Sequence, residues 1–188
     1  MLSKPIFIMG AHKSGTTLLR CLFDGTDDLC VIPFEPHIFE HLGFSINYGG
    51  RKARGENNNT ESIKNNLIRY IETVNFENDI HGGNDANSQI NLKIAKKFIL
   101  QINQNDNYIE IIEKYYNSIR HSLIDFNSSN NKRILDKSVE NSEFAILLKS
   151  FFPDAKFIHI IKNPYSNLVS IRRFKSRFGF PSLYKALA

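Results

Sequence analysis

The fold is decided by one stretch near the N-terminus, Pro5-Ile6-Phe7-Ile8-Met9-Gly10-Ala11-His12-Lys13-Ser14-Gly15-Thr16-Thr17-Leu18-Leu19. Residues 5–9 form a short unbroken apolar run, which is typical of a strand covered on both faces of a parallel sheet. Residues 10–15 form a glycine-bounded turn, and residues 16–23 carry apolar side chains at helical spacing until Gly25 ends the pattern. The order of strand, glycine loop and helix predicts a phosphate-binding unit of an α/β protein.

The loop Gly10–Thr17 has the chemistry to hold phosphate or sulfate. Glycine lets successive backbone N–H groups point inward, and the start of the next helix adds partial positive charge. An NTPase carries lysine directly after the second glycine, where this chain has Thr16, and the lysine stands instead at Lys13. This difference argues against ATP chemistry. Two alternative interpretations remain. The protein could be an ATP-dependent kinase with an altered loop, or the loop could be a turn that merely connects strand and helix.

The rest of the chain alternates strands with helices. Apolar runs predict further strands over 29–33, 133–136 and 156–161, and helical periodicity predicts helices over 60–74, 92–102, 108–126, 140–151 and 164–174. This alternation predicts an α/β fold, a three-layer parallel sheet with flanking helices that is similar to the P-loop NTPases. Residues 43–131 are expected to form a helical insertion on the acceptor side within a single domain, 1–188. A C-terminal truncation of this domain is one interpretation of its length.

Composition narrows the class of protein. Hydrophobic residues make up 41% and charged residues 23% of the 188 residues, which is the balance of a globular protein. The net charge of +5 is spread along the chain and suits a small polyanionic ligand, but charge alone would fit nucleic-acid binding equally well. The motifs must decide between the two, and from them we expect no nucleic acid. Cys21 and Cys30 are predicted to be reduced core residues. The absence of a signal peptide or a long apolar run predicts a cytoplasmic location without membrane insertion.

Residues 8–19 resemble the 5′-phosphosulfate loop of the sulfotransferase superfamily, whose donor is 3′-phosphoadenosine 5′-phosphosulfate (PAPS). The resemblance implies that Lys13 reaches the bridging oxygen and the transferring sulfuryl group. It also implies that the 5′-phosphate is held by Ser14, Gly15, Thr16 and Thr17. The family usually has Pro-Arg or Pro-Lys where this chain has His12-Lys13.

Phe34-Glu35-Pro36-His37-Ile38-Phe39 resembles a Lys-Glu-Pro-His-Phe-Phe signature of glycosaminoglycan-type and related sulfotransferases. In that family the glutamate is the catalytic base, which implies that Glu35 takes the proton from an acceptor hydroxyl. His37 is expected to pack or orient near the acceptor rather than to catalyse. The alternative interpretation of Glu35 is a surface carboxylate after a strand.

Residues 156–170 resemble the family's 3′-phosphate motif, a strand followed by Arg-Asp/Asn-Pro and a later serine. The resemblance implies that Lys162 and Ser170 supply a cation and a hydroxyl to the 3′-phosphate. Lysine stands where arginine is usual, so the bidentate fork is lost and donor affinity is expected to fall. Alternatively, both residues are exposed and have no ligand.

Asp136-Lys137-Ser138 resembles the Glu-Lys-Thr/Ser-Pro segment of many members, with Val139 in place of the proline. Lys137 is then a second cation near the acceptor or the sulfuryl group. A solvated surface lysine is the alternative.

The function expected from these resemblances is transfer of a sulfuryl group from PAPS to an acceptor hydroxyl, or to an amine, without a metal. The acceptor is expected to be a small molecule or a glycan chosen by residues 43–131. The rival hypothesis is a truncated, non-catalytic module that binds a nucleotide or a sulfated ligand. One sequence does not predict the oligomeric state.

Overall fold

The computed structural model describes residues 2, 4–44, 59–76, 90–123 and 132–177. The predicted end of the third insertion helix, residues 124–126, and most of the loops within residues 43–131 lie outside these ranges. None of the described helices combines the length and the apolar character needed to cross a membrane.

The described residues form a four-stranded sheet in which all paired strands are parallel, in the order β2-β3-β1-β4. β1 therefore lies between β3 and β4, and every residue of β1 is buried, as the apolar run predicts. β4 lies at the edge, with two of its five residues exposed and three partly buried. The strand bounds are β1 Ile6–Gly10, β2 Leu29–Val31, β3 Arg133–Lys137 and β4 Lys156–Ile160.

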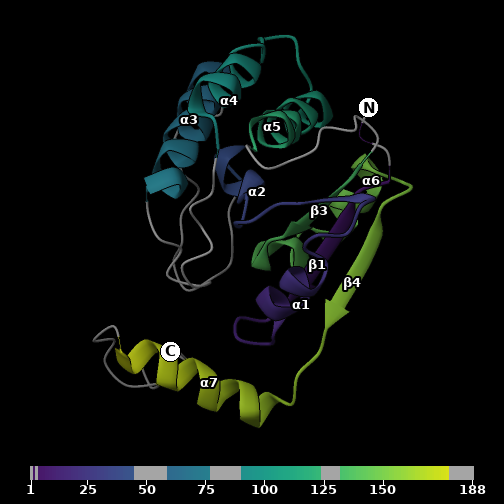
Figure 1. Cartoon of the computed structure of the whole chain (residues 1–188), viewed down its shortest axis with the longest axis vertical. Coiled ribbons are helices and arrows are strands. Elements are labelled where there is room, and N and C mark those ends of the chain that lie inside the picture. The colour runs from purple at the N-terminus through teal and green to yellow at the C-terminus, as the bar shows by residue number, and fades with distance from the viewer. Residues whose placement is uncertain (1, 3, 45–58, 77–89, 124–131, 178–188) are drawn as a thin grey trace.

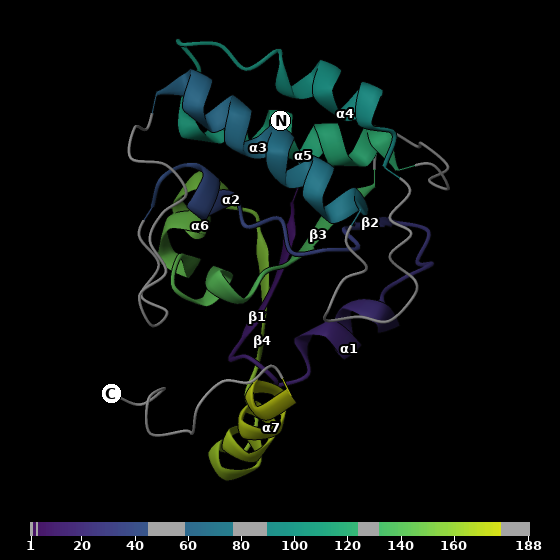
Figure 2. The same ribbon diagram turned by 90° about the vertical axis from the view of Figure 1, so that its left-hand side faces the viewer.

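Helices cover both faces of this sheet, which confirms the predicted three-layer arrangement (Figures 1 and 2). Successive residues of β1 point to opposite faces. Ile6 and Ile8 pack with Leu19 of helix α1, which spans Thr16–Leu22, and with Phe23, which directly follows that helix. Phe7 belongs to the larger core on the other face. The α-helices are α1 Thr16–Leu22, α2 Ile38–His41, α3 Thr60–Phe76, α4 Leu92–Ile99, α5 Tyr108–Ser122, α6 Ala145–Phe151 and α7 Pro164–Arg177.

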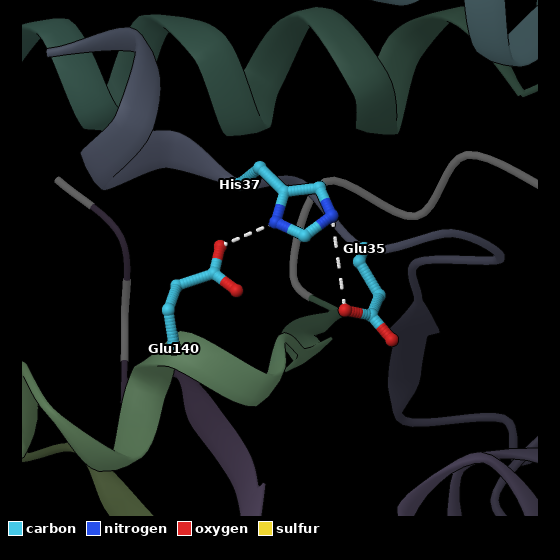
Figure 3. Close-up of side chains that lie close together, drawn as sticks. All are labelled: Glu35, His37 and Glu140. Atoms are coloured by element: carbon cyan, nitrogen blue, oxygen red, sulfur yellow. Dashed lines mark hydrogen bonds and ion pairs between the residues drawn. The ribbon is translucent and has the colours of Figure 1, made fainter. Parts of the chain in front are cut away.

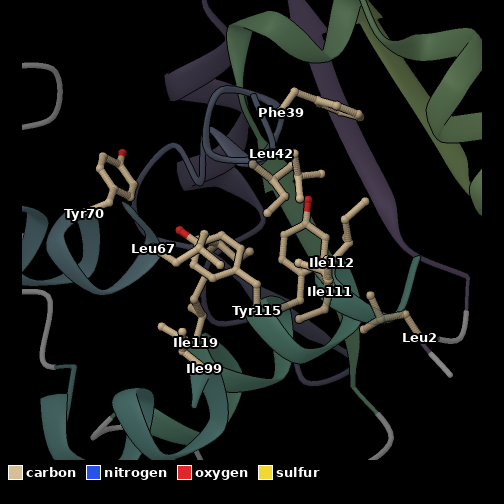
Figure 4. Close-up of a cluster of buried hydrophobic side chains, with 14 of the residues drawn as sticks. Leu2, Phe39, Leu42, Leu67, Tyr70, Ile99, Ile111, Ile112, Tyr115 and Ile119 are labelled. Atoms are coloured by element: carbon tan, nitrogen blue, oxygen red, sulfur yellow. The ribbon is translucent and has the colours of Figure 1, made fainter. Parts of the chain in front are cut away.

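The larger core joins α6 and the insertion helices to the sheet. Figure 4 shows part of this cluster, including residues of α2, α3 and α5. Leu42, Leu67 and Ile112 are fully buried there, and each such aliphatic side chain contributes about 1.5–3 kcal/mol by leaving water. This packing holds α2 and α3–α5 against β2 and β3, whereas α7 lies beyond the carboxyl ends of the strands (Figures 1 and 2).

Several sequence-based predictions were wrong in detail. The helices predicted over 92–102 and 108–126 end earlier, α4 at Ile99 and α5 at Ser122, after which the backbone of Leu123 is extended. The helix predicted over 140–151 is a 3₁₀ helix, η1 Val139–Ser142, followed by α6, because the backbone of Phe144 leaves the helical region. Cys30 is buried as predicted, but Cys21 is exposed. The reason is that the small core on this face takes up Leu19 and Phe23 and leaves the Cys21 side of α1 open to solvent.

Candidate active site

Each of the four strands ends beside one residue that sequence analysis singled out. Because the strands are parallel, their carboxyl ends meet at one edge of the sheet, where α/β proteins bind ligands. In the spatial order β2-β3-β1-β4, the residues at or just after the strand ends are Glu35, Lys137, Lys13 and Lys162. Sequence-distant residues thus come together as one row, which we call the carboxyl edge.

The loop after β1 is shaped by its backbone. Lys13 has φ 63° and Gly15 has φ 108°, so the chain enters the left-handed region twice within three residues. Ser14 N–H donates to the carbonyl of Ala11 at 3.1 Å, which closes the turn. The side chains of Ser14 and Thr16 are buried, and Lys13 is half-buried. The hydroxyl of Ser14 has no hydrogen-bond partner among the described residues.

Gly10 allows this loop to approach β4 closely. It pairs with Ile160 in the register of the sheet. A Cβ at Gly10 would lie 2.8 Å from the carbonyl oxygen of Ile160 and 2.8 Å from the hydroxyl of Ser14. A cradle that a Cβ would fill, lined by an unpartnered buried hydroxyl, suits an anion such as the 5′-phosphate of the expected donor.

Lys162 connects β4 and α7 to the same loop. Its Nζ donates to the carbonyl of Lys13 and to the hydroxyl of Ser170, both at 3.1 Å. Asn163 caps α7 by accepting from the backbone N–H groups of Tyr165 and Ser166, and Pro164 occupies the first helical position. The cap sets the direction of α7 and thereby brings Ser170 to Lys162. Both of these partners are neutral, so they do not compensate the positive charge of Lys162, which can pair with an anionic ligand.

Glu35 and Lys137 form an ion pair across the ends of β2 and β3. The side chain of Lys137 is 3% exposed, so this ammonium group is not the solvated surface cation of the alternative interpretation. Charges removed from water need partners, and Glu35, 16% exposed, supplies one while keeping contact with solvent. The structure therefore brings together two residues that sequence analysis connected only by resemblance.

His37 lies between Glu35 and a residue that the sequence did not reveal, Glu140 of η1 (Figure 3). Nδ1 of His37 is 2.8 Å from Oε1 of Glu140, and Nε2 is 3.7 Å from Oε2 of Glu35. Burial alone lowers the pKa of His37. The hydrogen bond to Glu140 and the surrounding carboxylates outweigh burial, so the net pKa lies above its ordinary value.

The three groups in Figure 3 place ligand atoms within 4.8 Å of one another, close enough to share a cation. Lys137 already supplies a positive charge at Glu35, and a protonated His37 supplies a second.

Asp136 on β3, the residue before Lys137, is a fully buried acid. It accepts hydrogen bonds from Tyr116 at 2.7 Å and from Ser138 at 2.9 Å. Burial, opposed in part by these hydrogen bonds, raises the pKa of Asp136 from 3.8 to about 6. Asp136 thus links α5 to the end of β3, one residue before Lys137.

Two insertion-helix tyrosines hold the chain around Glu35, and sequence analysis missed both. The hydroxyl of Tyr70 on α3 donates to the carbonyl of Glu35, and that of Tyr115 on α5 donates to the carbonyl of Pro36 at 3.1 Å. The sequence does carry a general signal for such residues. A tyrosine on the apolar face of a helix is buried, and its hydroxyl then needs a hydrogen-bond partner. The insertion helices therefore position the Glu35 segment.

A family model described as "Sulfotransferase family" matches residues 5–185. A solved structure titled "Sulfotransferase Domain from the Curacin Biosynthetic Pathway" is 19% identical, with a TM-score of 0.46. That comparison covers 98% of this chain and 56% of the other, so this chain spans little more than half the length of that domain. No curated protein sequence matches the chain.

Proposed function

The chain belongs to the sulfotransferase family, and from that premise we propose that it transfers a sulfuryl group from PAPS to an acceptor hydroxyl. The observation that carries the proposal is the order of residues along the carboxyl edge. Adjacent strands lie about 4.8 Å apart, so β2 and β4 are separated by roughly 14 Å. The nucleotide would lie along the β1 and β4 ends, and the acceptor would meet Glu35 at the β2 end.

In the proposed reaction the acceptor oxygen forms a bond to sulfur while the bond from sulfur to the bridging phosphate oxygen breaks. Glu35 takes the acceptor proton. The electron pair of the broken bond stays on the phosphate oxygen, where Lys13 stabilises the negative charge. Lys137 carries the cation nearest to Glu35 and would face the sulfuryl oxygens during transfer.

The donor would be held from two sides. The backbone and hydroxyls of residues 14–17 would bind the 5′-phosphate, since the Ser14 hydroxyl is buried and has no partner among the described residues. Lys162 and Ser170 would bind the 3′-phosphate. The Ser170 hydroxyl donates to the carbonyl of Ser166 at 2.9 Å, so it would have to rotate to donate to a phosphate.

The proposal is tested by calorimetric titration with adenosine 3′,5′-bisphosphate and by transfer of radiolabelled sulfate from PAPS to a panel of hydroxyl acceptors. Lys162→Met is expected to weaken nucleotide binding about 10–100-fold, the loss of one charge-assisted contact. Lys156→Met is the matched control, because Lys156 is exposed at the opposite end of the same strand. Equal binding by both variants would contradict the 3′-phosphate assignment.

The same two measurements separate the proposal from its rivals. Tight binding of the bisphosphate without transfer to any acceptor would favour a non-catalytic nucleotide-binding module. Magnesium-dependent binding of ATP in preference to the bisphosphate would favour a kinase. The acceptor class is proposed to be a small molecule or a glycan with a free hydroxyl, and the cytoplasmic location stays a prediction.

A further inference from the structure

Glu140 is a buried carboxylate that the proposed transfer does not use. It lies on η1, is 1% exposed, and faces His37 across 2.8 Å. A buried carboxylate without a cation or several hydrogen bonds costs several kcal/mol. Among residues 2, 4–44, 59–76, 90–123 and 132–177, His37 is the one hydrogen-bond partner of the Glu140 carboxylate. The charge state of the imidazole therefore decides how well Glu140 is stabilised.

The position of His37 between two carboxylates favours one charge state. A neutral imidazole has one N–H donor and one acceptor nitrogen, so one nitrogen would turn its lone pair toward a carboxylate. An imidazolium donates a hydrogen bond to Glu140 at 2.8 Å and places its other N–H, with its positive charge, 3.7 Å from a carboxylate oxygen of Glu35. Only the imidazolium is complementary to both neighbours (Figure 3).

The backbone holds His37 in this place at a cost. His37 has φ 49° and ψ 37°, a left-handed conformation, at the start of α2. For a residue other than glycine this conformation is strained and is found where surrounding contacts enforce it, often at functional sites. The bond to Glu140, 103 residues along the chain, is such a contact.

We propose that Glu140 is a positioning residue: it holds His37 as an imidazolium and thereby directs a second cation, besides Lys137, at the carboxylate of Glu35. This inference rests on the proposed function, in which Glu35 is the base. Two adjacent cations keep a carboxylate ionised to lower pH. Glu140 would thus extend the pH range in which Glu35 accepts a proton toward the acidic side.

Other charged and titratable groups pack around this pair on every side. Burial lowers the pKa of His37, but the bond to Glu140, followed by the charges of Glu140 and other carboxylates, raises it on balance. The groups from neighbouring elements are Glu35 before α2, Glu40 and His41 of α2, Tyr70 of α3, Tyr115 of α5, and Asp136 and Lys137 of β3.

The test begins with an NMR titration of the His37 imidazole, which needs neither donor nor turnover. The chain has 6 histidines, so the His37 signal is assigned by its loss in His37→Asn. Glu140→Gln keeps the shape and a hydrogen-bond acceptor but removes the charge, and is expected to lower the His37 pKa by about 1–3 units. Glu143→Gln is the control, because Glu143 is exposed beside η1. An unchanged His37 pKa in Glu140→Gln would overturn the inference.

The second readout is the pH profile of kcat/KM for sulfuryl transfer. In Glu140→Gln the acidic limb is expected to move up by about one pH unit, while affinity for adenosine 3′,5′-bisphosphate stays the same. A lowered His37 pKa with an unmoved acidic limb would also overturn the inference. If Glu140→Gln does not fold, His37→Asn replaces it as the test variant. This variant is then expected to shift the acidic limb of the kcat/KM profile in the same direction. A wild-type chain that binds the bisphosphate but transfers nothing would contradict the proposed function alone, since the NMR titration is read independently.

Discussion

The two halves of the carboxyl edge are built in opposite ways. At β1 and β4 the loop is shaped by backbone conformation. The Ser14 hydroxyl there has no hydrogen-bond partner within the described part of the chain, and Lys162 contacts a neutral carbonyl. At β2 and β3 the shape comes from buried side chains with opposite charges, above all Lys137 with Glu35. The first half is prepared to receive a charge from outside, and the second already carries its counter-charges.

This difference suits two different tasks. A donor with two phosphates brings its own negative charge, so a site for it needs uncommitted N–H groups and cations. A general base must keep one protonation state and one orientation, which buried partners provide. Changes in the β1/β4 half should therefore alter donor binding or leaving-group stabilisation, and changes in the β2/β3 half should alter proton transfer.

The largest effect is expected from Glu35→Gln, which removes the proposed base. Transfer should fall about 10²–10⁴-fold, and binding of adenosine 3′,5′-bisphosphate should largely survive, because the nucleotide half is untouched. Radiolabelled transfer and calorimetry measure the two quantities, and thermal unfolding checks that Lys137 still has an acceptable partner. Glu61→Gln, at an exposed position of α3, is the control. Turnover at the wild-type rate would mean that another group is the base.

A smaller loss is expected from Lys13→Met, which keeps the apolar stem and removes the charge. Transfer should fall on the order of 10²–10³-fold, the usual cost of losing one charge stabiliser. In contrast to Glu35→Gln, this loss should not depend on the pKa of the acceptor hydroxyl, because Lys13 acts on the leaving oxygen. An equal dependence on acceptor pKa in both variants would show that the two halves do not act separately.

Gly10→Ala tests whether the loop is shaped by close approach. Its Cβ would lie 2.8 Å from the backbone oxygen of Ile160, which cannot move without disturbing β4. Overpacking of this kind costs about 1–3 kcal/mol, measurable by denaturant unfolding. Bisphosphate affinity should fall as well. Gly25→Ala is the comparison, because its Cβ would meet nothing within 4 Å, so that only its φ of 78° is unfavourable. Equal losses of affinity would argue against a cradle at Gly10.

The smallest effect concerns stability and pH. The folded pKa of Asp136, about 6, lies above its ordinary 3.8, so the fold binds this proton more tightly than the unfolded chain does. That contribution is fully present below about pH 4 and is lost as pH rises to about 6. Asp136→Asn should remove this part of the pH dependence. Above pH 6 the variant should be more stable by about 1 kcal/mol, once weakened hydrogen bonds from Tyr116 and Ser138 offset most of the relief.

Thermal unfolding of both proteins from pH 4 to pH 8 measures this difference. The titration of His37 is common to both proteins and largely cancels in the comparison. A difference that stays constant across the range would show that Asp136 does not titrate there.

Local patterns predicted much of the fold. The strand at 5–9, the helix at 60–74 and the strand at 156–161 all appear within two residues of their predicted ends. Periodicity over a few residues reports on burial, and burial is set by short segments. The same argument failed at 140–151, where η1 precedes a shorter helix. Glu140 is turned into the protein and bonds to His37, 103 residues away in the sequence.

Predicting the candidate site was possible in part. Lys13, Lys162 and Glu35 each follow an apolar run closely, and parallel strands bring such positions to one edge. The sequence carried no signal for Glu140, and for Tyr70 and Tyr115 it showed only that a buried phenol needs some partner. Their actual partners are His37, Glu35 and Pro36 respectively. Each of those contacts joins a helical segment to the Glu35 segment, and the two partners are 35–103 residues apart in the sequence.

By itself, the sequence determined that this chain has a phosphate-type loop between a buried strand and a helix, since glycine spacing and apolar runs are local properties. Only the tertiary structure decided which charges meet: that Lys137 is buried against Glu35, and that His37 is placed between two carboxylates. The physical reason is that electrostatic pairing depends on distance in space and on exclusion of water, and neither is encoded in the spacing of residues along the chain.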